Sequence, residues 1–429
     1  MRNHAIVTTK NAIWYILAIS ALLRAAVMIT AGDSMYLYSD DVTYIYSAID
    51  FLKSGHITYA YQDYITVFGM PGMFVFLAGI FKIFGYGETG IFAAKVIFNI
   101  LGVLTVYGIY LTAKIISKND NIANIAALMS GVSLPLICIN NLFLTETPSL
   151  CLLIFLTYFL FKFAEEPREG NFVFLVLTYI ACVLFKPVFG IYPAAFLPVF
   201  IYRHFSFKEI VKRGLMAAVA LIVCVAPWSI KNYCVTGDVI LLSGNQGDTL
   251  LLGSFDGEDV PPGTYNEAVQ AADAAAQEKG LSHPYFRFKE RGVIGKARMD
   301  EWKETAPMSY YKSTYFLKPW KLIKSVYYPF EIFGIKAEHI YPFHNIQLIL
   351  SAVGIAICIL LAKRNFGRFC YAASFLLGSL LIIYINAHYA AIARYGMTML
   401  LATAVFAALG IYFIAKAFRL LLIKVGLLK

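Results

Sequence analysis

The chain has 429 residues, of which 59% are apolar and 14% charged, and its mean hydropathy is +0.67. A soluble globular protein carries about 25% charged residues, so this composition excludes a water-soluble enzyme and a disordered chain. It indicates a polytopic membrane protein. The net charge of +10 fits an excess of Lys and Arg in cytoplasmic loops, and no nucleic-acid partner is expected.

Apolar runs of membrane-spanning length follow one another along the chain. A span needs about 20 mostly apolar residues. Eight runs qualify: 12–31, 90–113, 121–139, 147–163, 213–229, 346–362, 370–387 and 396–415. The stretch 171–202 is too long for one span and is interrupted at Lys186-Pro187, which predicts two short spans and a tight hairpin. We expect an all-α fold with ten to eleven transmembrane helices in a single domain, 1–429.

Short basic loops predict the orientation, because Lys and Arg are enriched on the cytoplasmic side. The basic positions are Arg2 and Lys10, Lys114 and Lys118, Arg203 to Arg213, Lys363 to Arg368, and Lys416 to Lys424. Placing all of them inside gives ten spans with both termini cytoplasmic. The size of the chain and the absence of an Asn-x-Ser/Thr site in the sequence favour a plasma (cytoplasmic) membrane. The segments 32–89 and 230–345 are then large extracytoplasmic loops. The apolar stretch 68–84 cannot span in this arrangement, so we expect a re-entrant or interfacial helix there.

The two outer loops carry helical patterns. In 40–54, apolar residues recur at helical spacing, which predicts an amphipathic juxtamembrane helix capped by Ser39 or Asp40. Further helices are expected over 266–280 and 297–323. Six aromatic residues fit an interfacial belt, or alternatively a lid over the substrate groove: Tyr310, Tyr311, Tyr315, Trp320, Tyr327 and Tyr328.

Charged residues gather at the predicted outer face on separate segments. Three are acidic: Asp40, Asp41 and Glu146. Three are cations without an acid nearby in the sequence: Lys186, Arg394 and Arg24. Each has a simpler explanation as a helix cap or a snorkelling side chain. Together they suit chemistry at a phosphate leaving group, because a carboxylate can deprotonate a hydroxyl and Lys and Arg can stabilise phosphate charge.

These residues lie in motifs that resemble the GT-C superfamily of membrane glycosyltransferases, in the branch of the protein O-mannosyltransferases and the lipid A aminoarabinose transferase (family 39). Asp40-Asp41 with Tyr44 stands where that family has an Asp-Glu pair followed by a Tyr, with Asp41 replacing Glu. LFLTETPSL places Glu146, FKPVFGIY places Lys186 and ARYGM places Arg394. APWSIKNYCVTGDVILLSGNQGD is the most specific stretch and leads into a Gly-rich loop.

The chain departs from the family pattern at several positions. Met70-Pro71 replaces the usual Pro-Pro, Lys95 replaces an Arg, and the Pro that usually follows Arg394-Tyr395 is absent. The resemblance rests on the order of these short motifs over nearly the whole chain.

The resemblance implies an inverting hexosyl- or pentosyltransferase that moves a sugar from a polyprenyl-phosphate donor to a hydroxyl or lipid phosphate on the extracytoplasmic face. The acceptor would be an envelope lipid, polymer or protein, and membrane lipids would surround the chain. Asp40 would be the general base. Asp41 and Glu146 would orient the acceptor or the base, or hold a divalent metal ion, whose requirement the resemblance leaves open.

Further roles follow from the same resemblance. Lys186 and Arg394, with Arg24, would bind the donor phosphate. Tyr44, Tyr395 and His388 are candidates for the substrate groove.

Two other functions stay open. A lipid-linked-sugar flippase or transporter would show inverted repeats and charges at the bilayer midplane, neither of which is evident. A polysaccharide polymerase or ligase would centre its site on Arg and His in a late outer loop, for which four histidines are candidates: His283, His339, His344 and His388. The predicted topology favours a lipid-linked donor, because nucleotide sugars are cytoplasmic.

Overall fold

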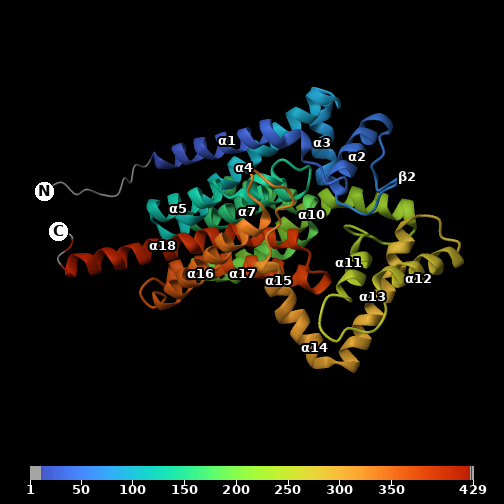
Figure 1. The fold of residues 1–429 in the computed structure, drawn as a ribbon. Coiled ribbons are helices and arrows are strands. Elements are labelled where there is room, and N and C mark those ends of the chain that lie inside the picture. Colours follow the sequence, from blue (N-terminus) through green and yellow to red (C-terminus); the bar gives the residue numbers. More distant parts are fainter. Residues whose placement is uncertain (1–10, 426, 428–429) are drawn as a thin grey trace.

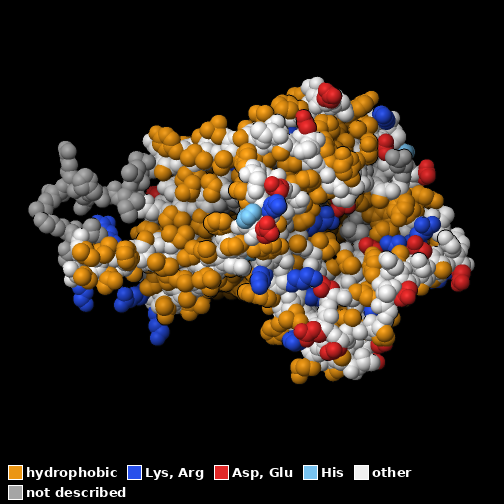
Figure 2. Space-filling view, in the orientation of Figure 1, with side chains coloured by type: hydrophobic (Ala, Val, Ile, Leu, Met, Phe, Trp, Pro, Cys, Tyr) orange, Lys and Arg blue, Asp and Glu red, His pale blue; other side chains and the backbone are white. Residues whose placement is uncertain are grey.

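The structure is a computed structural model that describes residues 11–425 and 427. It is a bundle of long helices with a lobe of shorter helices at one end (Figure 1). The helix α1 begins and α18 ends at the other end of the bundle, where Figure 2 shows Lys and Arg side chains gathered beside a largely hydrophobic surface. The basic residues Arg2 and Lys10 lie outside the described residues.

Among the described residues, seven helices are long and apolar enough to cross a membrane. They are α1 (Ala12–Ala31), α4 (Glu88–Ser117), α7 (Glu146–Glu165), α10 (Phe207–Thr236), α16 (Ala337–Leu360), α17 (Phe366–Tyr389) and α18 (Met399–Lys424). Shorter apolar helices cover Pro71–Phe84, Glu169–Phe185 and Pro187–Tyr202. The expected all-helical membrane fold is confirmed.

The predicted span 121–139 is wrong as one continuous helix. It consists of α5 (Asp120–Gly131) and α6 (Leu134–Ile139), separated by Val132 and Ser133. Pro135 lies in the first turn of α6, where its missing N–H is tolerated, whereas inside a longer helix it would remove a backbone hydrogen bond.

The predicted interruption at Lys186 is confirmed. Helix α8 (Glu169–Phe185) ends there, and Lys186 is extended, with φ −140° and ψ 111°. A residue before proline is disfavoured in the helical region, so Pro187 starts a new element. This is the 3-10 helix η2 (Pro187–Phe196), which continues into α9 (Leu197–Tyr202).

The segment between α1 and α4 contains a short 3-10 turn η1 (Gly32–Ser34), α2 (Asp40–Ser54), the antiparallel strands β1 (Thr58–Tyr59) and β2 (Tyr61–Ile65), and α3 (Pro71–Phe84). The predicted amphipathic helix is confirmed as α2, which ends at Gly55 with φ +73°, a left-handed conformation that glycine adopts without strain. Fourteen residues give α3 a length of about 21 Å, shorter than the hydrocarbon core of about 30 Å.

The segment between α10 and α16 forms the lobe. It contains α11 (Gln246–Gly253), α12 (Tyr265–Glu278), α13 (Tyr285–Thr305), α14 (Pro307–Lys312), a π turn η3 (Ser313–Leu317) and α15 (Lys318–Lys324). The helices expected over 266–280 and 297–323 are confirmed, while the expected Gly-rich loop contains the short helix α11. The extracytoplasmic assignment of 32–89 and 230–345 stays a prediction.

The core of the bundle lies around the first half of α18, where every residue of Met399–Gly410 is buried. The helices α18 and α16 approach each other closely here. A Cβ at Gly410 of α18 would lie only 2.3 Å from the carbonyl oxygen of Leu350 on α16, so a glycine is required at this contact. The 3-10 helix η4 (Ala393–Thr398) joins α17 to α18. It thereby presents Arg394 at the end of the bundle where α1 ends.

Candidate active site

Asp40 and Arg394, separated by 354 residues in the chain, form an ion pair. Nη1 of Arg394 donates to Oδ2 of Asp40 at 2.5 Å, and the hydroxyl of Tyr59 donates to Oδ1 of Asp40 at 2.8 Å. The Asp40 and Arg394 side chains are 31% and 26% exposed. Asp40 is the first residue of α2, where the free backbone N–H groups favour a carboxylate. A small molecule can therefore reach both groups.

Glu146 and Lys186 form a second ion pair at 2.8 Å, with Glu146 only 3% exposed. Glu146 begins α7, and Lys186 occupies the break between α8 and η2. A buried carboxylate needs a partner to offset its desolvation, and Lys186 provides it. Solvent still reaches the Lys186 side of this pair, because the Lys186 side chain is 18% exposed.

Tyr395 connects the two pairs. The Lys186 ammonium lies 5.8 Å from the centre of its ring and the Arg394 guanidinium 5.7 Å from it. Asp40, Glu146, Lys186 and Arg394 therefore form one group, which we call the charged cluster. Two acids and two cations balance each other there.

Tyrosines surround the charged cluster. The Tyr44 and Tyr59 rings lie 5.2 Å apart, and burial raises the pKa of both phenols, so Tyr59 remains a hydrogen-bond donor to Asp40 at neutral pH. Burial also raises the pKa of Tyr327 to about 12, opposed by Arg394 and assisted by Glu146. Sequence reasoning missed Tyr59 as a neighbour of the cluster, and it named Tyr327 only as part of an interfacial belt or a lid over the substrate groove. The run of tyrosines in YAYQDY was the available signal for Tyr59.

Asp41 is fully buried and holds the turn before α2. Its Oδ2 accepts from the backbone N–H of Leu37 at 2.7 Å and its Oδ1 from that of Ser39 at 3.0 Å. The Ser39 side chain makes no capping hydrogen bond, and the Asp40 oxygens accept from Tyr59 and Arg394, so the expected capping by Ser39 or Asp40 is wrong. Asp41 organises the backbone that presents Asp40.

Arg24 lies inside the bundle. It is 1% exposed, and it donates from Nε to Oδ1 of Asn140 at 2.9 Å and from Nη1 to the carbonyl oxygen of Gly131 at 3.0 Å and to the hydroxyl of Ser20. Each of these partners belongs to the bundle and none to the charged cluster. The structure therefore gives Arg24 a packing role between α1 and the α5–α6 region, and it does not bring Arg24 to the predicted phosphate site.

The four histidines are dispersed. His283 and His344 each place Nε2 against a backbone carbonyl, at 3.1 and 3.0 Å, and Nδ1 of His339 accepts from a backbone N–H. His388 is exposed near the end of α17. Within the described part of the chain, none of the four forms an ion pair with the charged cluster.

The candidate metal ligands do not fit a divalent ion. Asp41 uses both oxygens on backbone N–H groups, and Glu146 is neutralised by Lys186. In residues 11–425 and 427, no group of three or more His, Cys, Asp or Glu side chains is arranged to hold a metal.

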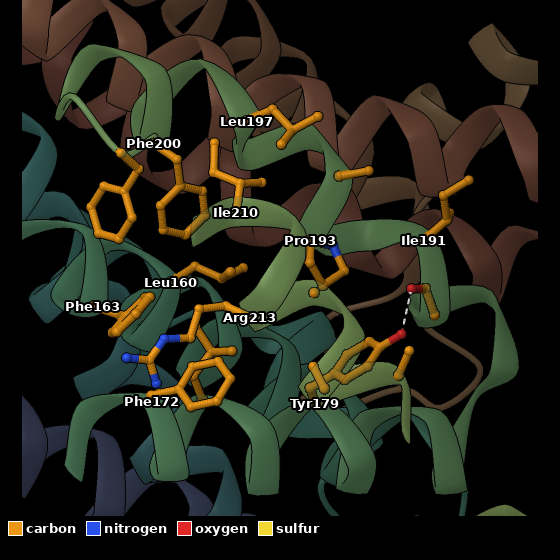
Figure 3. A pocket seen from close by; sticks show the side chains of 17 residues that line it. Leu160, Phe163, Phe172, Tyr179, Ile191, Pro193, Leu197, Phe200, Ile210 and Arg213 are labelled. Carbon is orange, nitrogen blue, oxygen red and sulfur yellow. Dashed lines mark hydrogen bonds between the residues drawn. The ribbon is translucent and has the colours of Figure 1, made fainter. Parts of the chain in front are cut away.

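A pocket of about 380 Å³ lies away from the charged cluster, among α7, α8, η2, α9 and α10 (Figure 3). Its lining is mainly aliphatic and aromatic. Its polar side chains have partners, because the hydroxyl of Tyr179 donates to the carbonyl oxygen of Gly190 and Arg213 pairs with Glu169 and Glu209. Such a pocket suits a hydrocarbon chain and not a sugar or a phosphate. It is joined to the cluster by η2, which begins directly after Lys186.

Comparisons with known proteins agree on the kind of fold. The family model described as dolichyl-phosphate-mannose-protein mannosyltransferase matches residues 70–230, a range that includes Glu146 and Lys186. The apo oligosaccharyltransferase of Archaeoglobus fulgidus superposes with a TM-score of 0.59 at 14% identity, covering 97% of this chain and 52% of its own. Its complex with an inhibitory peptide and a dolichol-phosphate gives a TM-score of 0.55, with the same identity and coverage.

One further solved structure is similar only at a low TM-score. ArnT from Cupriavidus metallidurans, bound to undecaprenyl phosphate, has a TM-score of 0.42 at 14% identity, covering 94% of this chain and 78% of its own, too low to add to the assignment. No curated protein sequence matches the chain. The chain spans about half the length of the archaeal oligosaccharyltransferase, and 14% identity establishes only the fold. With this fold, and with the family model matching residues 70–230, the chain has the architecture of the GT-C superfamily of membrane glycosyltransferases.

Proposed function

We propose that the chain is an inverting glycosyltransferase that moves a sugar from a polyprenyl-phosphate-linked donor to a hydroxyl or lipid phosphate acceptor at the extracytoplasmic face of the plasma membrane. The charged cluster is the observation that carries this proposal. It combines a partly exposed carboxylate, Asp40, with two cations, Arg394 and Lys186, at one end of a membrane bundle.

Asp40 is the general base in this proposal. It accepts the proton of the acceptor hydroxyl as the acceptor oxygen attacks the anomeric carbon. The bond between that carbon and the phosphate oxygen breaks, and its electron pair stays on the phosphate. A single displacement from the opposite face inverts the anomeric configuration.

Arg394 and Lys186 receive the charge of the departing phosphate. Before donor binding, each is paired with a carboxylate, Asp40 or Glu146. A phosphate that binds both cations draws Arg394 away from Asp40 and frees Oδ2 for the acceptor hydroxyl. Tyr59 keeps Oδ1 in place meanwhile. Glu146, almost without exposure, acts as a positioning residue for Lys186.

A long isoprenoid tail is consistent with the apolar pocket. The helix η2 starts beside Lys186 and contributes Gly190, Ile191, Pro193 and Ala194 to the pocket lining. A phosphate on Lys186 would therefore lie a few residues along the chain from Gly190, the first residue of η2 that lines the pocket. The structurally similar archaeal oligosaccharyltransferase has been solved with a dolichol-phosphate, which supports a lipid-phosphate donor for this chain as well.

The decisive experiment uses the full chain in nanodiscs with radiolabelled polyprenyl-phosphate sugars and either water or crude envelope acceptors. Asp40→Asn keeps the size of the side chain and removes the base, so we expect donor consumption to fall by about 10²- to 10⁴-fold while donor binding persists. Asp50→Asn is the matched control, because Asp50 lies on the same helix and accepts from Thr58.

Two outcomes would oppose the proposal. Equal turnover by wild type and Asp40→Asn would reduce Asp40 to a structural residue and pass the base role to Glu146. Absence of turnover with every donor and acceptor would favour the flippase, to be followed by a lipid-translocation assay. Chain elongation of a lipid-linked glycan would identify the polymerase or ligase.

A further inference from the structure

The lobe exposes a row of apolar side chains on the continuous helix Pro307–Lys324, formed by α14, the π turn and α15. The row consists of Met308, Tyr311, Tyr315, Phe316 and Trp320, each at least 45% exposed. We call it the aromatic stripe. It differs from the belt expected from the sequence, because Tyr310 and Tyr328 are buried.

The opposite face of this helix is firmly packed. Ser313, Lys318 and Leu322 are buried, and Nζ of Lys318 donates to the carbonyl oxygen of Gly253 at 2.7 Å. The Tyr310 ring packs edge-on against the buried Trp302 at 5.4 Å. These contacts fix which face of the helix is left uncovered, and they argue against a movable lid.

The π turn aligns the aromatic stripe. In a regular α-helix each residue advances by about 100°, so Trp320, twelve residues after Met308, would stand about 120° away around the axis. A π turn accommodates one extra residue without advancing the helix. The rotation from Met308 to Trp320 is then that of eleven regular residues instead of twelve, which places Trp320 within about 20° of Met308. The irregularity at Ser313–Leu317 thus keeps both ends of the stripe on one face.

The helix sits at the level where a spanning helix ends. Gly253, whose carbonyl oxygen accepts from Lys318, packs closely on the end of α17. A Cβ at Gly253 would lie 1.4 Å from the carbonyl oxygen of Tyr389, the last residue of α17. A Cβ at Gly396 in η4 would lie 2.1 Å from the carbonyl oxygen of Leu322. Figure 1 shows α14 and α15 extending sideways from this end of the bundle, and Figure 2 shows hydrophobic side chains along the edge of the same lobe.

The chemistry of the surface fits a lipid headgroup region. Tyr and Trp combine an apolar ring with a polar tip and are enriched at membrane–water interfaces. Lys303, in the last turn of the preceding helix α13, and Lys324, the last residue of this helix, are both exposed. Lysines near the membrane surface attract anionic lipid headgroups. Lys312 and Lys321 pair with Glu258 and Asp256, so Lys303 and Lys324 are the lysines that we expect to interact with the headgroups.

We propose that the helix Pro307–Lys324 is an interfacial anchor whose aromatic stripe lies in the outer leaflet of a phospholipid membrane. It holds the lobe against the membrane beside η4, which carries Arg394. No catalytic step involves this anchor, and its place in the outer leaflet rests on the orientation given in the proposed function.

Spin labelling of the full chain in vesicles of phosphatidylcholine and phosphatidylglycerol tests the anchor. The exposed Cys224 and Cys234 are first replaced by Ala and Ser. A label at Phe316→Cys is then compared with one at Ala274→Cys, an exposed position of α12 in the same lobe. We expect label 316 to collide several-fold more often with oxygen than with a water-soluble nickel chelate, and label 274 to show the reverse preference.

Two results would overturn the anchor. Equal nickel accessibility at both positions would place the stripe in water. Protection of label 316 from both reagents would mean that protein covers it, for example a second copy of the chain. Trp320 supplies an independent reading, because lipids brominated near the headgroup should quench its fluorescence, measured as the difference between wild type and Trp320→Phe. Neither reading uses turnover, so failure of the anchor and failure of the proposed transferase are separable.

Discussion

Asp40 and Asp41 are adjacent in the chain but make different kinds of contact. Asp40 offers its oxygens to two side chains and remains partly exposed, whereas Asp41 is buried with both oxygens on backbone N–H groups. The sequence could place both at the start of a helix, and the resemblance to GT-C enzymes selected Asp40. It could not separate their roles, because burial of Asp41 depends on how the preceding turn folds.

Glu146 and Lys186 provide a test of coupling between stability and activity. Glu146→Gln leaves the Lys186 ammonium without its counter-charge in a largely buried position, and breaking such a pair costs about 3–5 kcal/mol. We expect a lower melting temperature in detergent and loss of transfer. The double variant Glu146→Gln/Lys186→Met should recover most of the stability but not the activity. Recovery of both would show that Lys186 has no part in donor binding.

At the scale of the element, the sequence predicted what local signals determine. Lys186-Pro187 marked the break after α8, because the residue before proline has a restricted backbone. The left-handed Gly55 that ends α2 is a local signal of the same kind. Pro135 was the same kind of signal for the break between α5 and α6. The continuous apolar composition of 121–139 nevertheless led to the prediction of one unbroken span. The hairpin β1–β2 has too few residues for a periodic pattern.

Lys318 ties α15 to α11, and its burial predicts a pH dependence of stability. Desolvation lowers the pKa of Lys318 from 10.5 to about 8, with Asp256 opposing and Lys321 assisting this shift. Between about pH 8 and 10.5 the unfolded chain binds more protons than the native protein does, so this residue makes the free energy of unfolding rise with pH there. Below pH 8 the cost of burying the charge is fully present.

Lys318→Met removes that contribution. Melting temperatures of wild type and variant are compared from pH 7 to 10.5 in the same detergent, and we expect their difference to move in favour of wild type as the pH rises. A difference independent of pH would mean that Lys318 keeps its charge throughout. Lys312→Met is the control, since Lys312 is exposed on the same helix, pairs with Glu258 and does not contribute to the pKa shift of Lys318.

At the scale of the whole molecule, the charged cluster depends on tertiary contacts that no local pattern encodes. Asp40 comes from the segment after α1, Glu146 from the start of α7 and Arg394 from the turn before α18. The motifs could place these residues at one face, and the fold brings four of the six predicted charged residues together. Arg24 failed to join them because a cation inside a span can be satisfied by the bundle itself, here by Asn140 and Gly131.

The apolar pocket and the charged cluster share η2, and this connection can be tested by donor length. Ala194→Phe fills the pocket, so we expect the KM for an undecaprenyl-phosphate sugar to rise about tenfold, the equivalent of about 1.4 kcal/mol. A geranyl-phosphate sugar, whose short tail need not enter the pocket, should be used as by wild type, and kcat should stay unchanged for both.

Val219→Phe is the control for this pair of donors, because Val219 is exposed on α10 and does not line the pocket. If Ala194→Phe impaired both donors equally, the substitution would act through η2 on Lys186 and not through the tail. If it impaired neither, the tail would lie elsewhere on the bundle, and the pocket would serve only the packing of α10 against α8.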